Sequence, residues 1–196
     1  SSRSPRAPPQ PVSNMHSPLS QPAEAALWAI ATMDVREHPP DFAVLRVPSI
    51  VENYVDSLLE TLTAEYLAGE SRFEIALEQL ARERLHQNWS ARRESLRDSF
   101  GVSVDGRVED QDFMLLVQLR NAVAHGTGTL TRLQRARLSE QLELERNLRQ
   151  RLLVRVDGYR LRTTRETALS AMRIGNRFVR VLDIEAGPAL RGRGLA

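Results

Sequence analysis

Apolar residues recur at three- and four-residue steps along most of the chain, the spacing that places them on one face of an α-helix. The clearest stripes run from Val51 to Tyr66 and from Phe113 to Ala124. Similar but weaker stripes occur elsewhere in the chain. Together they predict helices over residues 22–34, 49–66, 71–85, 90–100, 109–125 and 131–149, and a last helix that begins at Thr163 or Thr164.

Residues that typically start or stop helices set several of these boundaries. Ser49 and Glu52 have the spacing of a capping box, and Pro48 stands directly before them. The pair Pro39–Pro40 is expected to end any helix that precedes it. In the 131–149 segment the stripe is only in partial register, and its apolar face is expected to consist of Leu133, Leu138, Leu142 and Leu148.

Before the last expected helix the period of the pattern changes to two. The runs 152–156 and 159–162 flank Asp157–Gly158, a residue pair that two-residue hairpin turns prefer. We therefore predict an all-α protein, an antiparallel bundle of about five to six helices with one small β-hairpin before the last helix.

The helical domain is expected to span residues 23–186, between two polar tails. Residues 1–22 are rich in proline and serine, and residues 187–196 are rich in glycine and arginine, so both are expected to be disordered. The 196-residue chain has no cysteine, which excludes disulfides and zinc–thiolate sites. Its histidines lack metal-ligand spacing, and we expect no cofactor. No apolar run approaches the roughly 20 residues that cross a bilayer, so the expected location is the cytoplasm, without membrane contact.

The charges of the chain are unevenly distributed, and all 27 basic residues are arginine. Residues 23–129 hold 18 acidic residues and 10 arginines, a balance of −8; residues 130–196 hold 15 arginines and 7 acidic residues, a balance of +8. The basic part can attract a polyanion. Alternatively, the two halves pair with each other in a monomer or a dimer, and a GC-rich genome would also favour arginine codons.

The end of the 109–125 segment carries the residues with the clearest chemical potential. Asn121 and His125 are four residues apart and share one face of a helix, while Arg120 lies about 140° from His125 around the axis. Placed before Gly126 at a helix end, the three side chains can converge on one small anion. The alternative is a structural helix in which His125 interacts with the helix dipole and Arg120 pairs with a carboxylate.

The stretch Leu119–Gly126 resembles the signature of HEPN-domain proteins: Arg, a polar residue, three variable residues and His at the end of a long bundle helix. Glu52-Asn53-Tyr54, the hairpin and the last helix look like the prokaryotic subgroup of HEPN-like nucleases, so the resemblance covers about residues 45–185. It implies a metal-independent endoribonuclease, often a toxin or an anti-phage effector, that forms a homodimer with a composite site. Some members carry a modified tyrosine two residues after the His, where this chain has Thr127, although control by another antitoxin or regulatory protein stays open.

The resemblance also implies roles for individual residues. His125 would act as general base on the ribose 2′-hydroxyl or as acid toward the leaving 5′-oxygen, Arg120 would stabilise the charge on the phosphate, and Asn121 would orient His125 or the phosphate. Cleavage would leave 2′,3′-cyclic phosphate and 5′-hydroxyl ends.

Other residues could support this site. Arg132, Arg135 and Arg137 follow the motif and could line an RNA groove, or they form a solvated helix face. Glu52 could lie beside the site from the facing helix, or it is only a capping residue. Two further functions stay open: a non-catalytic module that binds RNA, a nucleotide or a partner protein through the same groove, and a structural dimerisation domain.

Overall fold

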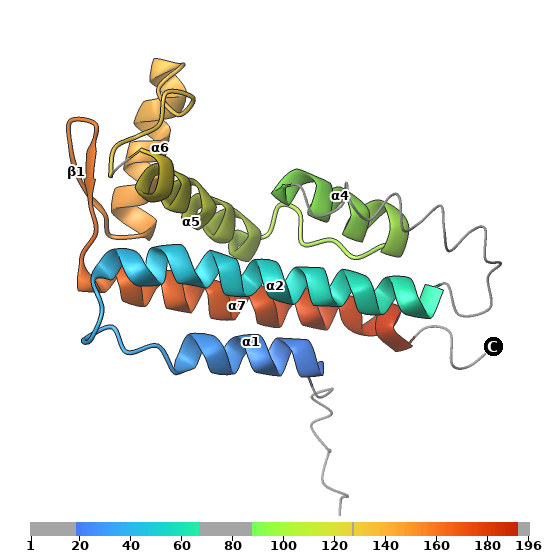
Figure 1. Ribbon diagram of the computed structural model, residues 1–196. Helices are drawn as coiled ribbons and strands as arrows, with labels where there is room; N and C mark the ends of the chain where they lie inside the picture. The colour runs from blue at the N-terminus through green and yellow to red at the C-terminus, as the bar shows by residue number, and fades with distance from the viewer. Residues whose placement is uncertain (1–18, 67–87, 127, 192–196) are drawn as a thin grey trace, which may run out of the picture.

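The computed structural model describes residues 19–66, 88–126 and 128–191. Helices make up most of this part, and the fold class is confirmed as all-α with one hairpin before the last helix. Figure 1 shows the elements α1 (Gln21–Ala31), α2 (Pro40–Tyr66), α4 (Trp89–Phe100), α5 (Val108–His125), α6 (Leu138–Arg151), β1 (Arg155–Asp157), β2 (Arg160–Arg162) and α7 (Arg165–Arg191). The helix expected over residues 71–85 lies outside the described residues. Among the described helices, none is both long and apolar enough to span a membrane.

The two longest helices, α2 and α7, lie side by side and run in the same direction (Figure 1). A Cβ atom on Gly175 of α7 would meet Val47 of α2, and about two turns further along both helices Tyr54 donates a hydrogen bond to Asp183. Helix α1 runs the opposite way across both. The expected antiparallel order therefore holds for α1 but not for the α2–α7 pair, because α4, α5, α6 and the hairpin intervene before the chain returns to the start of α2.

The core lies where α2, α5 and α7 meet. Phe113 of α5 stacks on Phe178 of α7 with ring centroids 4.3 Å apart, and Trp89 of α4 packs against Phe113 at 4.7 Å. All three side chains are buried, and burial of such large apolar surfaces supplies the main driving force for folding. This cluster fixes the N-terminal half of α5 in the bundle, so the C-terminal half of α5 extends toward the hairpin.

A buried carboxylate ties α1 to the two central helices. Asp183 of α7 is only 5% exposed and accepts hydrogen bonds from Ser20 N (2.8 Å), from Ser20 Oγ (2.5 Å) and from the hydroxyl of Tyr54 (3.1 Å). Three donors offset much of the cost of burying a charge. Ser20 also caps α1 through its contact with the backbone N–H of Ala23, so this helix begins inside the arm expected over residues 1–22.

The start of α2 differs from the sequence prediction. The helix begins at Pro40, and the expected boundary residue Pro48 lies inside it, where its side chain is buried. Proline suits the first position of a helix, because a backbone N–H at that position would have no intrahelical acceptor and its absence costs nothing. Ser49 therefore cannot act as a cap; its hydroxyl donates to the carbonyl of Leu45 at 3.2 Å.

The segment after α5 also differs from the prediction. Residues 131–137 form turns, and α6 begins at Leu138 instead of Thr131. The side chain of Gln134 stabilises the turns, because it accepts from the backbone N–H of Thr131 (2.9 Å) and donates to the carbonyl of Gln118 in α5 (2.9 Å). The buried residues of α6 are Gln141, Leu144 and Leu148, whereas the expected face members Leu133, Leu138 and Leu142 are exposed.

The hairpin is present, with its turn one residue later than predicted. Asp157 pairs with Arg160, so the two turn residues are Gly158 and Tyr159, and Gly158 has a φ of +56°. A positive φ at the first turn position favours glycine. This register places Val156 opposite the buried Leu161 on the inner face.

The last helix continues beyond the boundary expected at residue 186. Helix α7 passes through Gly187 and Pro188 and ends at Arg191, because Ala186 is buried and Leu190 packs against the core. The tail expected over residues 187–196 is therefore helical for its first part.

Candidate functional site

Helix α5 positions the Arg120, Asn121 and His125 side chains at its C-terminal end. Its inner face buries Phe113, Leu116, Leu119 and Ala122, which anchors the helix on α2 and α7. The opposite face stays accessible, and Ala124, which was expected in the core stripe, is exposed. The motif therefore lies at the surface, on a helix whose other face is held by the core.

The structure brings Arg120 and Asn121 together. Arg120 is half-buried, and its Nη1 donates a hydrogen bond to Oδ1 of Asn121 at 3.1 Å. This contact draws the guanidinium across the helix surface toward the face that Asn121 shares with His125. An arginine has five N–H donors, and this is the one hydrogen bond that Arg120 makes among the described residues. The remaining donors are available to a ligand.

His125 is exposed in the last turn of α5, where the chain reverses sharply after it. Gly126 donates to the carbonyl of Ala122 and accepts from the N–H of Thr129, both at 2.9 Å. A Cβ atom at position 126 would come within 1.9 Å of the carbonyl oxygen of Thr129. Glycine is thus required for this close approach, which holds the chain after His125 against the end of the helix.

No acidic residue of the described segments forms an ion pair with Arg120, Arg132 or Arg135. Glu52 does not reach the motif in this arrangement, since its carboxylate accepts from Trp89 Nε1 at 3.0 Å. Trp89 packs on Phe113, which lies seven residues and about 10 Å along α5 from Arg120. The structure therefore places Glu52 beside α4, and it is not a capping residue either, because α2 has already begun.

The three arginines that follow the motif lie around the turns of 131–137 and have different neighbours. Arg137 forms an exposed ion pair with Glu140 at 2.8 Å. The guanidinium of Arg135 lies over the ring of Tyr159 at 5.0 Å from its centroid, a cation–π contact with the tip of the hairpin. Arg132 is exposed. The turns thus present Arg132 and Arg135 next to the motif, while Arg137 is already neutralised.

Sequence reasoning did not assign the hairpin to the site, yet the structure attaches it directly to the end of α5. Leu161 N donates to the carbonyl of Gly128 at 2.8 Å, and Leu130 N donates to the carbonyl of Tyr159 at 3.0 Å. Thr129 and Arg160 form an isolated antiparallel bridge. The alternation of arginine with apolar residues around Leu161 was the signal that a basic strand face exists, but only the fold shows that it lies next to His125.

A cavity of about 800 Å³ in the described part of the chain is separate from the motif. It lies along α7 and is lined by residues that include Leu153, Leu169 and Arg173, and none of Arg120, Asn121 and His125 contributes to it. The motif is the stronger candidate site, because it combines a guanidinium that has no ion pair among the described residues with a side chain that can transfer protons. No described cluster of three or more His, Asp or Glu side chains could hold a metal ion.

Comparisons of the chain with protein-family models, with curated proteins and with solved structures found no match. The resemblance to HEPN domains therefore stays a prediction from the residues of the motif.

Proposed function

We propose that this protein is a metal-independent endoribonuclease of the HEPN type. One observation carries the proposal: the guanidinium of Arg120 is hydrogen-bonded to Asn121 and to no carboxylate of the described chain, on the same helix end as the exposed His125. A cation without a counter-ion beside a histidine suits the binding and cleavage of a phosphodiester.

These residue types can support cleavage through the ribose 2′-hydroxyl. A neutral imidazole at His125 takes the proton of the 2′-hydroxyl, and the freed oxygen attacks phosphorus. The bond from phosphorus to the 5′-oxygen breaks, and an imidazolium donates a proton to that oxygen. Arg120 stabilises the additional negative charge on the phosphoryl oxygens, and Asn121 fixes the direction of the guanidinium. The products are a 2′,3′-cyclic phosphate and a 5′-hydroxyl.

The need for both a base and an acid favours a dimeric site. Each chain offers one histidine at the end of α5, and a second copy of the motif would supply the other proton-transfer group. The accessible surface around Asn121, Ala124 and His125 suits the approach of a second α5. We therefore propose a homodimer in which two motifs face each other, acting on RNA in the cytoplasm as a toxin or defence effector.

The test is RNA cleavage in the presence of EDTA, followed by end-group analysis. The native protein should leave 2′,3′-cyclic phosphate ends and should not cut DNA, which lacks the attacking hydroxyl. His125→Ala should lower the rate by about 10²-fold or more. His38→Ala is the matched control: His38 is an exposed histidine between α1 and α2 that contacts Phe42, and its loss should leave the rate unchanged.

Two results would contradict this function. One is full activity of His125→Ala, and the other is cleavage that requires a divalent cation.

A non-catalytic binding module is the second candidate function. It is favoured by the exposed Arg132 and by Arg135, which extend the positive surface beyond the proposed catalytic residues. Such a module would bind RNA with an affinity that falls with salt, and the RNA would stay intact.

A further inference from the structure

The outer face of the β-hairpin carries more positive charge than its neighbours neutralise. Arg155 lies directly opposite Arg162, and Arg160 is on the same face, two residues before Arg162. Like charges directly opposite each other destabilise an antiparallel pair, and a two-stranded hairpin has little stability of its own. Because all three arginines are exposed, this repulsion would be relieved by an anion bound to the face.

Two carboxylates lie near these arginines without forming an ion pair with Arg160 or Arg162. Asp157 is the cross-strand neighbour of Arg160. Glu166, at the start of α7, has its pKa lowered mainly by a hydrogen bond from Thr164, and Arg155 also contributes to the shift. Arg155 is thus partly compensated by Glu166, although none of the three arginines forms an ion pair among the described residues.

The position of this face relative to the motif is fixed by backbone hydrogen bonds. The segment from Gly128 to Leu130 pairs with the strand from Tyr159 to Leu161, with Thr129 opposite Arg160. Side chains of paired residues point to the same face of a sheet, so Arg160 leaves the sheet beside Thr129, four residues after His125. Arg162 lies two residues further along the same strand, so its Cα atom is about 6.6 Å from that of Arg160.

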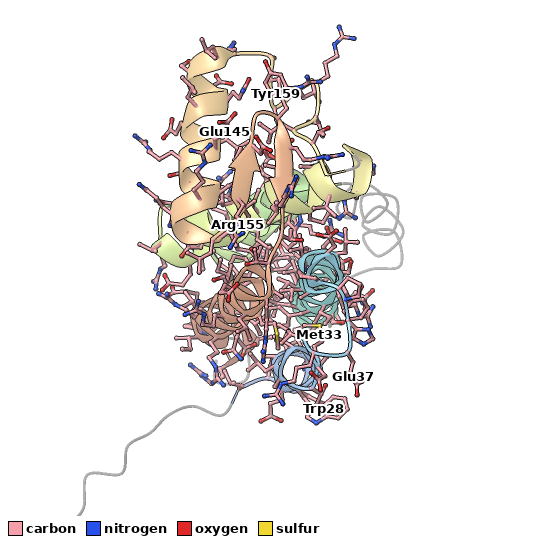
Figure 2. The ribbon with its side chains drawn as sticks, turned by 90° about the vertical axis from the view of Figure 1, so that its left-hand side faces the viewer. Trp28, Met33, Glu37, Glu145, Arg155 and Tyr159 are labelled. Atoms are coloured by element: carbon pink, nitrogen blue, oxygen red, sulfur yellow. The ribbon has the colours of Figure 1, made fainter. Side chains whose placement is uncertain are left out.

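The tip of the hairpin adds an aromatic side chain to the two cations. Tyr159 is 53% exposed, and the guanidinium of Arg135 lies 5.0 Å from its ring centroid. Figure 2 shows Tyr159 at the free end of the hairpin and Arg155 at its base, near the central helices. Planar groups of this kind stack on nucleobases that are not already stacked in a duplex.

We propose that Arg160 and Arg162 on the outer face of the hairpin, together with Tyr159 at its tip, bind a single-stranded segment of RNA next to the phosphate held by Arg120 and His125. The two arginines contact successive phosphates, and Tyr159 stacks on an unpaired base. This inference rests on the proposed function for the identity of the ligand. It specifies the substrate class as unpaired RNA, because a base in a duplex does not expose its face to Tyr159.

The test uses the full-length chain carrying His125→Ala, so that the RNA stays intact, and measures binding of a labelled single-stranded RNA by fluorescence anisotropy. Adding Arg160→Ala and Arg162→Ala should weaken binding about tenfold and reduce the slope of log affinity against log salt by roughly 1.4, since each contact with a single strand contributes about 0.7. Arg160→Lys with Arg162→Lys keeps both charges and should preserve the slope.

The matched control is Arg180→Ala with Arg191→Ala, two exposed arginines in the distal half of α7. This pair removes the same charge from the protein, but it should change affinity by less than about twofold and leave the slope unchanged. Equal weakening in the control and the hairpin variants would overturn the proposal, because the effect would then come from net charge alone. Thermal melting of every variant checks that the exposed substitutions leave the fold intact.

Tyr159 provides the test for single-stranded RNA. Tyr159→Leu should weaken single-strand binding by roughly 5- to 100-fold, whereas Tyr159→Phe, which keeps the ring, should bind like the parent. The parent should prefer the single strand over a duplex of the same sequence, and Tyr159→Leu should lose this preference. Equal binding of duplex and single strand by the parent would overturn the assignment of substrate class.

The failure of this inference can be separated from the failure of the proposed function. If the chain with His125 intact cleaves RNA and the hairpin variants bind like the control, the hairpin inference is wrong and the nuclease stands. If binding depends on the hairpin but no chain with His125 intact cleaves RNA, the hairpin inference stands and the protein is a binding module.

Discussion

The two ends of α5 differ in what their arginines contact. At the N-terminal end, Arg177 bonds to Glu109 at 2.8 Å, and Arg93 bonds to the buried Asp110 at 3.0 Å. At the C-terminal end, among the described residues, Arg120 bonds only to Asn121 and the nearby Arg160 has no ion pair. The same side-chain type therefore joins helices at one end and remains available for an external anion at the other.

This difference separates stability from function along one helix. Carboxylates in the first turn of a helix are favoured by the helix dipole, and they attract arginines from α4 and α7. The C-terminal end of a helix favours cations, so arginines can gather there without carboxylates. Removing an arginine at the N-terminal end of α5 should therefore reduce the stability of the protein. Removing one at the C-terminal end should reduce RNA cleavage.

The largest expected effect follows from Arg120→Ala. Loss of the guanidinium removes the group that stabilises charge on the phosphate, so the cleavage rate should fall by about 10²- to 10³-fold. The melting temperature should stay close to that of the native protein, because Arg120 forms no ion pair in the described chain. Rates from a metal-free cleavage assay and thermal unfolding curves measure the two effects on the same samples.

Arg177→Ala is the control for that substitution. Arg177 is exposed and pairs with Glu109, so its removal should leave cleavage unchanged and should lower the unfolding free energy by less than about 1 kcal/mol. The comparison breaks down if Arg177→Ala reduces cleavage as strongly as Arg120→Ala.

A pair of glycines provides the next test. Gly126→Ala would place a Cβ atom 1.9 Å from the carbonyl oxygen of Thr129, so the turn after His125 must move, and with it the strand that pairs with Arg160. Both stability and cleavage should fall, the latter by about tenfold or more, because small displacements of catalytic groups are costly.

Gly106→Ala is the matched change at the other end of α5. Gly106 has a φ of +79°, and no atom lies within 4 Å of the position that an alanine Cβ would take, so the substitution costs about 1 kcal/mol of backbone strain without a clash. Unfolding by urea should detect that loss, while cleavage should not change. Activity lost equally in both variants would mean that cleavage depends on global stability and not on the turn after His125.

Local patterns in the sequence predicted the parts of the fold that depend on local contacts. The Phe113 stripe and the glycine after His125 were sufficient to define α5, and the segment 90–100 forms α4 almost as expected. Pro48 misled the prediction of α2, because a proline inside a helix has the same local appearance as one that precedes it. The spacing of Leu133 and Leu138 is that of a helical face, but both side chains are exposed. The contact of Gln134 with α5 holds the residues before Leu138 in turns.

The candidate site was predictable to a similar extent. The spacing of Asn121 and His125 predicted that they share one face, and the structure adds the contact of Arg120 with Asn121. The convergence of all three side chains on an anion stays a prediction. The position of Arg160 close to the end of α5 was not predictable, because it depends on pairing between Thr129 and a strand about 30 residues further along the chain. Pairings of this kind are set by the whole fold and leave no periodic signal in the sequence.

A reciprocal test removes a paired arginine. Arg93→Ala would leave the carboxylate of Asp110, which is 4% exposed, without its ion pair. An unsatisfied buried polar group costs about 1–3 kcal/mol, so urea unfolding should show a loss in that range. Cleavage should be unchanged at temperatures where the protein is folded. Arg160→Ala, compared in parallel, should alter stability by less than about 0.5 kcal/mol, because Arg160 is exposed and forms no ion pair among the described residues.

The smallest expected effect is in the acid range, where two carboxylates that share Arg93 should respond in opposite directions. The hydrogen bond from Arg93 lowers the pKa of Asp105, so its contribution to stability is present above its ordinary pKa of 3.8 and is lost as the pH falls through the lowered value. Burial raises the pKa of Asp110, so its contribution is present below pH 3.8 and is lost as the pH rises through the raised value. Between about pH 6 and pH 3, urea unfolding of Asp105→Asn should therefore show a shallower loss of stability on acidification than the native protein, and Asp110→Asn a steeper one.

A matching series with Arg120→Ala should follow the native profile, because Arg120 has no ion pair among the described residues. Parallel profiles for Asp105→Asn and Asp110→Asn would show that Arg93 does not distinguish the exposed carboxylate from the buried one, and that the ion pairs at this end of α5 act only through their summed charge.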